Sequence, residues 1–569
     1  MRKKIAVSLV FVLFTFFGFN KSLNAQAFNN SQILPPNHWI YSNLKTLGMS
    51  QKQTFFNENS MMTIAEIKYY FEQIDYDKLD GVLYDIYDQT SDFLYGKKAL
   101  FNRDPFLFDF RIKLTPEFYY KSNDDIPWTF NYYYKDNLAT FPFKFGFSEY
   151  VTIQTDPFVG KSHYGSSRND SFTNFPYRNG DIEYILPRFA YGSTAFTFDN
   201  WGVNFHIGKE GFQIGDSKIG SVIYNHTFET DAYANLNLYS KYFKYSMDII
   251  QISGGSGDSG REKWFYVHQF TIRPHKTFKF SALEGSMLNA PFELRYLNPL
   301  MVMHQYSSWT EYDKGAGYTE NHFCAYLAGL IDWQPIQNLR IYALYAQNEL
   351  QLPTERDKTG KLYPDSLGAQ LGYEFIIPGE DGIFNAYTEA MYTTPYLYIK
   401  QNPESSLYRT RGDNLITDEV TTWIGSPYGP DSFGIKTGLG YQKPQKYTFD
   451  LSYLFLAKGE HDFSIFHSET NKDGKYVYYP REKYKEFGDG ELDPDDSNYN
   501  EILNDARWMW LCGTPYFLNT ISAEGNVVVN SRTSLDLKCA YTFIFNNYHI
   551  GGKFSHGVEI DFSLTYNLL

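Results

Sequence analysis

Hydrophobic positions recur along this chain with two different spacings, and the spacing changes once. Between residues 35 and 96, apolar side chains return every third or fourth residue, as in Ile64, Ile67 and Phe71. This spacing places them on one face of an α-helix. The pattern predicts a small N-terminal α-helical bundle, which we place at residues 28–100. Because so short a segment buries little surface, we expect it to dock on the rest of the chain.

From about Phe106 onward, apolar and polar residues alternate one by one. Every second residue of 141–147 is phenylalanine, which places Phe145 on one face of a strand and Lys144 on the other. Roughly 16 to 18 such segments follow one another, separated by clusters of Gly, Asn, Asp and Pro. Many are about 9–12 residues long, close to the length that a tilted strand needs to cross a bilayer. The pattern predicts a β domain over residues 101–569.

A transmembrane barrel explains the alternation together with the composition. In lipid only helices and closed barrels pair all their backbone groups, and a barrel strand turns alternate side chains to lipid and to a polar lumen. The mean hydropathy is only −0.44, although the chain holds 50 Tyr and 49 Phe. We therefore predict a mainly β protein, a large antiparallel transmembrane β-barrel of about 18 strands, with its aromatic excess at the membrane interfaces. A soluble exported β-sandwich or propeller is the competing interpretation.

The first 27 residues predict export. Basic residues at 2–4 precede an apolar run over 5–19, and the Ala-Gln-Ala at 25–27 has the form of a cleavage site, so we expect a signal peptide at 1–27. A formal net charge of −14 disfavours nucleic-acid binding, which needs a basic face. Three cysteines in 569 residues exclude a disulfide scaffold. We expect the protein in the outer membrane, in contact with its lipid.

The plan of a signal, a short helical bundle and a large barrel resembles the capsule assembly Wzi family. Two stretches carry the likeness. The first contains His38, Trp39, Leu44, Leu47, Gly48, Thr63 and Glu66. The second lies within 264–350 and includes the run Leu297-Asn298-Pro299 and the run Asp332-Trp333-Gln334-Pro335.

This resemblance implies a barrel of about 18 strands with a periplasmic helical head. It also implies a lectin-like, non-catalytic protein that assembles or anchors capsular or surface polysaccharide. A porin-like outer-membrane channel is the alternative, since the sequence does not distinguish a plugged lumen from an open one. The first stretch is also similar to half of an S-layer homology unit. Cell-wall polymer and the export machinery are therefore further candidate partners of the head.

The long polar segment 458–516 is the candidate ligand-binding region. Its rings suit stacking on sugar faces, and its polar groups suit bonds to sugar hydroxyls. The candidate ligand-binding residues are Tyr478, Tyr479, Lys483, Arg507, Trp508 and Trp510. Alternate carboxylates at 489–495 could hold Ca²⁺, a hard ion that prefers oxygen ligands, so calcium is the one candidate cofactor. The alternative interpretation is that the same segment is an ordinary solvated outer loop.

Catalysis has little support in the sequence. Neither the H-E-x-x-H nor the G-x-S-x-G pattern occurs, and no pair among the 12 histidines has metal-ligand spacing. We therefore predict a protein that is not an enzyme and name no catalytic residues.

Overall fold

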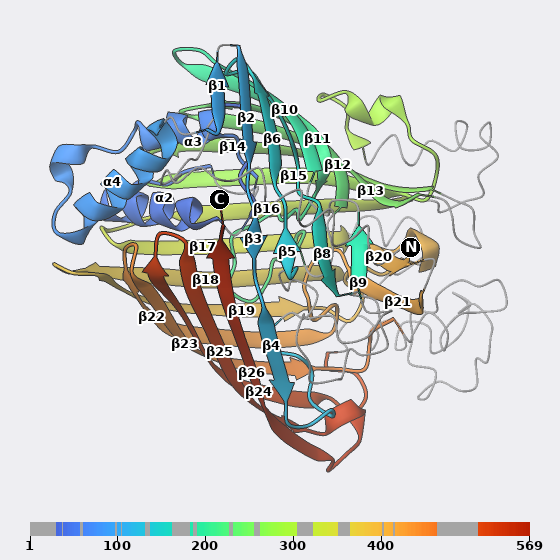
Figure 1. Ribbon diagram of the computed structural model, residues 1–569. Coiled ribbons are helices and arrows are strands. Elements are labelled where there is room, and N and C mark those ends of the chain that lie inside the picture. The colour runs from blue at the N-terminus through green and yellow to red at the C-terminus, as the bar shows by residue number, and fades with distance from the viewer. Residues whose placement is uncertain are drawn as a thin grey trace, which may run out of the picture.

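A computed structural model describes most of the chain. The described residues are 30–36, 38–56, 61–96, 99–103, 105–130, 137–161, 182–185, 190–226, 231–254, 262–303, 323–350, 365–400, 403–413, 416–463 and 510–568. Within them the chain forms a small helical head and one large barrel of antiparallel strands (Figure 1). The predicted signal peptide lies outside these residues. None of the described helices is both long and apolar enough to span a membrane.

The head consists of α2 (Trp39–Ser50), α3 (Ile64–Phe71) and α4 (Val82–Tyr95), with the short helix η1 (Tyr76–Lys78) between the last two. The face predicted from the helical spacing is the buried one, since Ile64 and Ile67 are fully buried. Thr63 caps α3, because its hydroxyl accepts a hydrogen bond from the backbone N–H of Glu66 at 3.3 Å. The predicted helical bundle is confirmed.

The barrel sheet contains 24 hydrogen-bonded strand segments. They are β1 (Phe101–Arg103), β2 (Phe106–Phe110), β3 (Lys113–Leu114), β4 (Glu117–Lys121), β5 (Ala139–Thr140), β6 (Phe143–Phe147), β7 (Val151–Thr155), β8 (Phe158–Lys161), β9 (Ile182–Ile185), β10 (Ala190–Thr197), β11 (Trp201–Glu210), β12 (Asp231–Ser240), β13 (Phe243–Gly254), β14 (Glu262–His275), β15 (Phe278–Leu288), β16 (Phe323–Trp333), β17 (Leu339–Glu349), β18 (Ser366–Pro378), β19 (Ile383–Thr393), β22 (Ser432–Lys443), β23 (Tyr447–Lys458), β24 (Tyr516–Asn530), β25 (Thr533–Phe545) and β26 (Phe554–Asn567). A separate hairpin is formed by β20 (Tyr408–Asp413) and β21 (Ile416–Trp423).

Several of these segments are pieces of one barrel strand. The groups β2–β4, β5–β6, β7–β8 and β9–β10 each follow one path and pair with the same neighbouring path, while β1 is a short hairpin partner of β2. Counted in this way, the described segments make about 18 barrel strands, as an outer-membrane barrel allows. The barrel closes where β26 pairs with β4, with Phe562 opposite Phe118. The predicted fold class is therefore confirmed.

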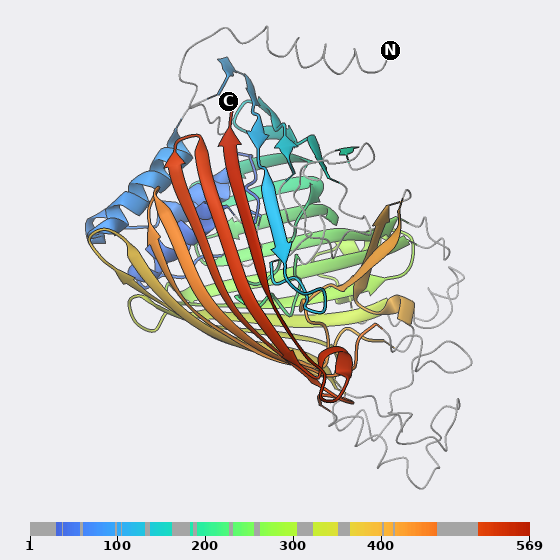
Figure 2. The ribbon, with the colours of Figure 1, turned by 60° about the horizontal axis from the view of Figure 1, so that its bottom comes forward.

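The two ends of the barrel differ in the length of their connections. At one end the turns are short, for example Ser531 and Arg532 between β24 and β25. At the other end β23 and β24 are separated by residues 459–515. We call these the helix end and the loop end, because the head lies beside the short turns (Figures 1 and 2). There the backbone N–H of Thr54 donates to the carbonyl of Lys276 at 2.7 Å.

The outward side chains of the barrel wall are mainly apolar, whereas many of its inward side chains are polar. Phe145 and Phe147 are 51% and 53% exposed, whereas Lys144, which directly precedes Phe145, is buried. Lys144 lies opposite Asp109 of β2 across the strand pair, so the inner surface carries paired charges. The predicted facing of this strand agrees with the structure. An apolar outer face with a polar inner face is the arrangement of a barrel that stands in lipid.

Candidate functional site

A segment between two wall strands fills much of the barrel lumen. Residues 211–226, which connect β11 to β12, fold inward, and we call them the plug. Phe212, Ile214 and Val222 of the plug are at most 1% exposed. They form one apolar core with inward-facing wall residues such as Tyr326 and Leu344. Within the described residues, this part of the lumen is packed protein.

Polar wall residues hold the backbone of the plug. Glu389 of β19 accepts hydrogen bonds from the backbone N–H groups of Lys218 and Ile219, at 2.8 and 3.1 Å. Gln370 of β18 donates to the carbonyl of Gly220 at 2.7 Å and accepts from the N–H of Val222 at 2.9 Å. These bonds satisfy backbone groups that the plug brings into an otherwise apolar core.

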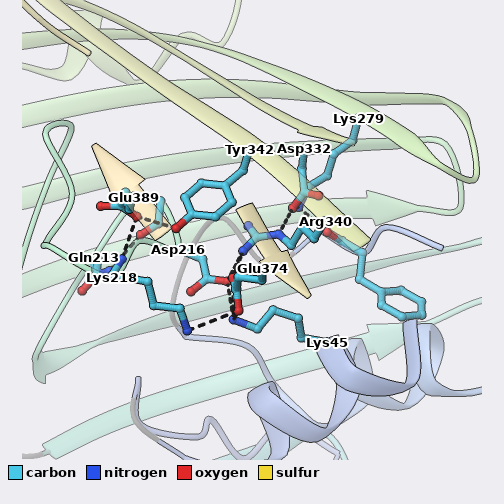
Figure 3. A network of polar contacts seen from close by, with 12 residues as sticks. Lys45, Gln213, Asp216, Lys218, Lys279, Asp332, Arg340, Tyr342, Glu374 and Glu389 are labelled. Carbon is cyan, nitrogen blue, oxygen red and sulfur yellow. Dashed lines mark hydrogen bonds and ion pairs between the residues drawn. The ribbon is translucent and has the colours of Figure 1, made fainter. Parts of the chain in front are cut away.

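A charged junction joins the head, the plug and the wall (Figure 3). It consists of Lys45 from α2, Asp216 from the plug, and Asp332, Arg340 and Glu374 from β16, β17 and β18. The ammonium of Lys45 lies 3.0 Å from carboxylate oxygens of both Asp216 and Glu374. The guanidinium of Arg340 lies 3.0 Å from Asp216 and 2.8 Å from Asp332. Each cation therefore bridges at least two parts of the molecule.

The junction shifts the titration of its two groups that lie outside the wall. Burial alone would raise the pKa of Asp216, but the charges of Lys45 and Arg340 outweigh it and lower that pKa to about 2. Burial would lower the pKa of Lys45, but the carboxylates of Asp216 and Glu374 raise it above its ordinary value. Both groups therefore stay charged at neutral pH.

A second inward loop covers the plug from the loop end. The hydroxyl of Tyr398 donates to the carbonyl of Val222 at 2.5 Å. Arg409, in the first strand of the hairpin β20–β21, forms a fully buried ion pair with Asp231 and donates to the hydroxyl of Tyr224 at 3.1 Å. The short helix η5 (Pro403–Ser405) lies in the same connection. These contacts therefore hold the plug in place from the loop end of the barrel.

The head closes the helix end with buried polar contacts. Glu66 of α3 and Lys244 of β13 form an ion pair of 2.6 Å in which neither side chain is more than 2% exposed. Asn204 of β11 donates to the other carboxylate oxygen of Glu66 at 3.0 Å. Arg273 of β14 reaches the head as well and donates to Gln73 at 2.6 Å. The inner wall thus supplies the partners that hold the head in place.

Of the six candidate ligand-binding residues, the structure describes one. The other five, and the carboxylates considered for calcium, lie outside the described residues. Trp510 is 46% exposed, and its ring lies 5.6 Å from that of Tyr392 and 6.1 Å from that of Phe433. Tyr392 points out of the barrel, because its strand neighbours Met391 and Thr393 are buried inside. Trp510 therefore stands at the outer wall near the loop end, a position typical of an aromatic girdle.

Among the described residues, no group of three His, Cys, Asp or Glu side chains is arranged to hold a metal ion.

The sequence pattern does not predict the charged junction. It does mark Arg340 as a lumen-facing charge, because Arg340 alternates with the apolar residues Leu339 and Ile341. Its partner Asp216 lies 124 residues away, and no spacing rule connects the two.

Comparison with solved structures relates this architecture to known barrels. Wzi of Escherichia coli, described as an outer membrane protein involved in group 1 capsule assembly and a carbohydrate-binding β-barrel, matches with a TM-score of 0.54 at 11% identity, over 94% of this chain and 99% of that one. OprD of Pseudomonas aeruginosa has a TM-score of 0.38 at 9% identity, over 81% of this chain and 95% of its own. An anion-selective porin of Comamonas acidovorans has a TM-score of 0.32 at 8% identity, over 81% of this chain and 99% of its own. No family model and no curated protein matches the chain. The likeness to Wzi shows the fold of an outer-membrane β-barrel.

Proposed function

We propose that this protein is a non-catalytic outer-membrane barrel that assembles or anchors capsular or other surface polysaccharide. The observation that carries the proposal is the filled lumen. A porin needs a continuous water-filled path, whereas here the plug buries Phe212, Ile214 and Val222 between the walls. The porin-like alternative would require the plug and the head to move aside. A barrel with a packed interior is better suited to holding a ligand on its rim.

The orientation follows from the asymmetry of the connections. Outer-membrane barrels have short periplasmic turns and long outer loops. The helix end, including the head at 28–100, would therefore face the periplasm, and the barrel at 101–569 would carry its long loops outside. Export by the signal peptide at 1–27 belongs to the same proposal. In this orientation the exposed face of the head is available to cell-wall polymer or to the export machinery.

The loop end is where a surface polysaccharide would be held. Sequence reasoning assigns this role to Tyr478, Tyr479, Lys483, Arg507 and Trp508 in the longest loop. The location of Trp510 beside the outward ring of Tyr392 supports a loop whose C-terminal end lies at the membrane interface. Neutral or weakly acidic sugars fit best, because the segment 487–496 is rich in carboxylates. A calcium-dependent contact is the other way to hold an acidic polymer there.

A loop deletion tests this proposal. Removing residues 472–500 should leave a folded barrel that migrates with its heat-modifiable mobility, and should release polysaccharide from the cell surface into the medium. Planar-bilayer recordings on the unaltered protein give the second readout, for which we expect no steady conductance. Full retention of the surface glycan by the deletion strain, together with an open-pore conductance of the unaltered protein, would favour the channel.

A further inference from the structure

The turn between β25 and β26 holds three residues in a backbone conformation that side chains disfavour. Asn546, Tyr548 and His549 have φ angles of 55°, 58° and 60°, within the short helix η7 (Asn547–His549) and its cap. Asparagine tolerates this left-handed region, but for an aromatic residue such as tyrosine it is strained. Strain of this kind persists where the surrounding structure imposes it, and it concentrates at ligand-binding sites.

A network of hydrogen bonds imposes this conformation. Asn546 accepts from the backbone N–H of Gly552 at 2.9 Å and donates to the carbonyl of Pro515 at 3.1 Å. Asn547 donates to the carbonyl of Asp125, on the neighbouring connection after β4, at 2.8 Å. His549 bonds to the carbonyl of Thr514 at 2.8 Å. The turn is therefore pre-formed, and it contacts the 122–130 segment at the loop end through Asp125.

The strained turn presents one aromatic ring to solvent among charged groups. Tyr548 is 55% exposed. The ammonium of Lys553 lies 4.2 Å from the centre of its ring, and the hydroxyl of Tyr548 lies 3.5 Å from a carboxylate oxygen of Asp125. Desolvation raises the pKa of Tyr548, and the nearby charges of Asp125 and Asp124 raise it further. Lys553 in turn lies 3.8 Å from Asp125, so the ring is fixed by partners on one side.

We propose that Tyr548, with Asp125 and Lys553 beside it, forms a stacking site for one sugar ring of a hydroxyl-rich, neutral or weakly acidic glycan. The inference rests on the proposed function and assigns it a specific surface outside the longest loop. The open face of Tyr548 stacks on the apolar face of the sugar, in the way that aromatic rings cover flat apolar surface. The carboxylate of Asp125 accepts hydrogen bonds from sugar hydroxyls, and Lys553 donates to them.

The placement of the charges favours a sugar over a phosphate group. Two carboxylates, Asp124 and Asp125, lie near Tyr548, and the ammonium of Lys553 lies 3.8 Å from Asp125, so a strongly anionic ligand would be repelled. Two sources share the sugar chemistry, namely the surface polysaccharide and the saccharide part of lipopolysaccharide in the outer leaflet. The turn lies just beyond the outward rings of Phe545 and Phe554, which pack at 5.1 Å, so both sources reach it.

Because the strain and the ring belong to the same residue, one substitution separates binding from stability. In Tyr548→Gly the backbone conformation becomes unstrained, since glycine adopts positive φ at no steric cost. The thermal midpoint of the full-length purified protein should stay equal or rise. Its affinity for polysaccharide isolated from the surface of the producing cells, measured by calorimetric titration, should fall about tenfold or more. Tyr548→Phe, which keeps the ring, should bind within about threefold of the unaltered protein.

Gln445→Gly is the matched control. Gln445 has a φ of 58° in the exposed β22–β23 turn at the opposite end of the barrel. Its replacement relieves the same kind of strain and should leave glycan binding unchanged. A parallel titration with purified lipopolysaccharide identifies the source of the sugar, because only the true ligand should lose affinity in Tyr548→Gly.

The outcomes separate this site from the proposed function. If the unaltered protein binds polysaccharide, and Tyr548→Gly binds each glycan as tightly as the unaltered protein does, the stacking site is wrong and the proposed function stands. If Tyr548→Gly loses binding only together with a lower thermal midpoint, Tyr548 is structural and the inference is overturned. If the unaltered protein binds neither glycan, the proposed function fails first, and this site fails with it.

Discussion

The head closes the helix end of the barrel and the plug occupies its lumen, and these two closures make different kinds of contact. The head keeps most of its apolar core to itself, and it meets the wall through polar groups such as the buried pair Glu66–Lys244. The plug shares its apolar core with the wall and uses polar groups such as Glu389 to satisfy its backbone. A closure made of ion pairs depends on geometry and charge, whereas an apolar closure depends on buried area. The two closures should therefore fail under different perturbations.

Removing the plug should have the largest effect. Replacing residues 212–224 by a short Gly-Ser linker removes the apolar core of the lumen but leaves every wall strand intact. We expect the altered barrel to fold and to conduct ions in planar bilayers, whereas we expect no steady conductance from the unaltered protein. Ile223→Asp, at a fully buried position, should give brief openings by the same route. A silent plug-less barrel would mean that the head and the outer loops suffice to seal it.

Breaking the buried pair of the head should be the next largest effect. Glu66→Ala leaves the ammonium of Lys244 buried without its carboxylate, which costs about 3–5 kcal/mol of unfolding free energy. Urea titration monitored by protease sensitivity of the head would measure this loss. The double variant Glu66→Gln with Lys244→Met should recover part of it. The exposed pair Lys78–Asp75 is the control, where Lys78→Ala should leave the urea midpoint unchanged because solvent screens the pair.

The contrast between the two closures also explains how far the sequence could be interpreted. The head and the wall strands have a regular period, so their buried faces could be predicted residue by residue, as for Ile64 and Phe145. The plug has no period, and its apolar residues Ile214, Ile219 and Val222 are interrupted by glycines. Such a segment is predicted as a loop, because its burial is decided by the barrel around it. The charged junction could not be predicted for the same reason, since its members come from distant parts of the chain.

The site residues illustrate a second limit. The candidate ligand-binding residues were chosen by composition, because rings and charges in a long loop suit a glycan. Composition does not show where a side chain points. In the structure, Trp510 lies beside Tyr392, whose ring points out of the barrel. The site at Tyr548 could not be predicted from the sequence, because neither its left-handed backbone nor its contact with Lys553 has a sequence signature. Strain and exposure become visible only in three dimensions.

The wall between the two closures gives a third prediction. Phe145→Arg places a cation on the outward face, where burial in lipid costs about 2–4 kcal/mol at mid-bilayer. Membrane insertion, followed by the heat-modifiable mobility of the barrel, should be impaired. Lys144→Gln on the inward face is the control and should insert normally. Equal tolerance of both changes would contradict the facing of this strand.

The structure revises one expectation for the same strand. The alternation alone predicts that Lys144→Glu is tolerated, because Lys144 faces the lumen. In the structure Lys144 is buried opposite Asp109, so a glutamate there would place two carboxylates across one strand pair. We expect Lys144→Glu to destabilise the barrel, although less than Phe145→Arg impairs insertion.

The smallest effect should be the acid sensitivity of the charged junction, which links the head to the plug. The pKa of Asp216 is lowered from its ordinary value of 3.8 to about 2. Its charged form therefore contributes stability above pH 3.8, and that contribution is lost as the pH falls from 3.8 towards 2. Because the Asp216 side chain is 30% exposed, solvent screens the interaction, and we expect about 1 kcal/mol or less. Lys45 adds no pH dependence in this range, since its pKa is raised and it stays protonated.

Hydrogen exchange isolates this contribution from the other carboxylates of the protein. The unaltered protein and Asp216→Asn are compared at several pH values between 5 and about 2, the lowered pKa of Asp216, with exchange followed at the backbone of α2 and of the plug. The unaltered protein should lose protection of α2 on acidification, whereas Asp216→Asn should start lower and change less. The apolar core of the plug should stay protected in both, because protonation does not alter its buried area. Parallel curves for the two proteins would show that Asp216 does not hold the head, and would leave Glu374 as the partner of Lys45 within the junction.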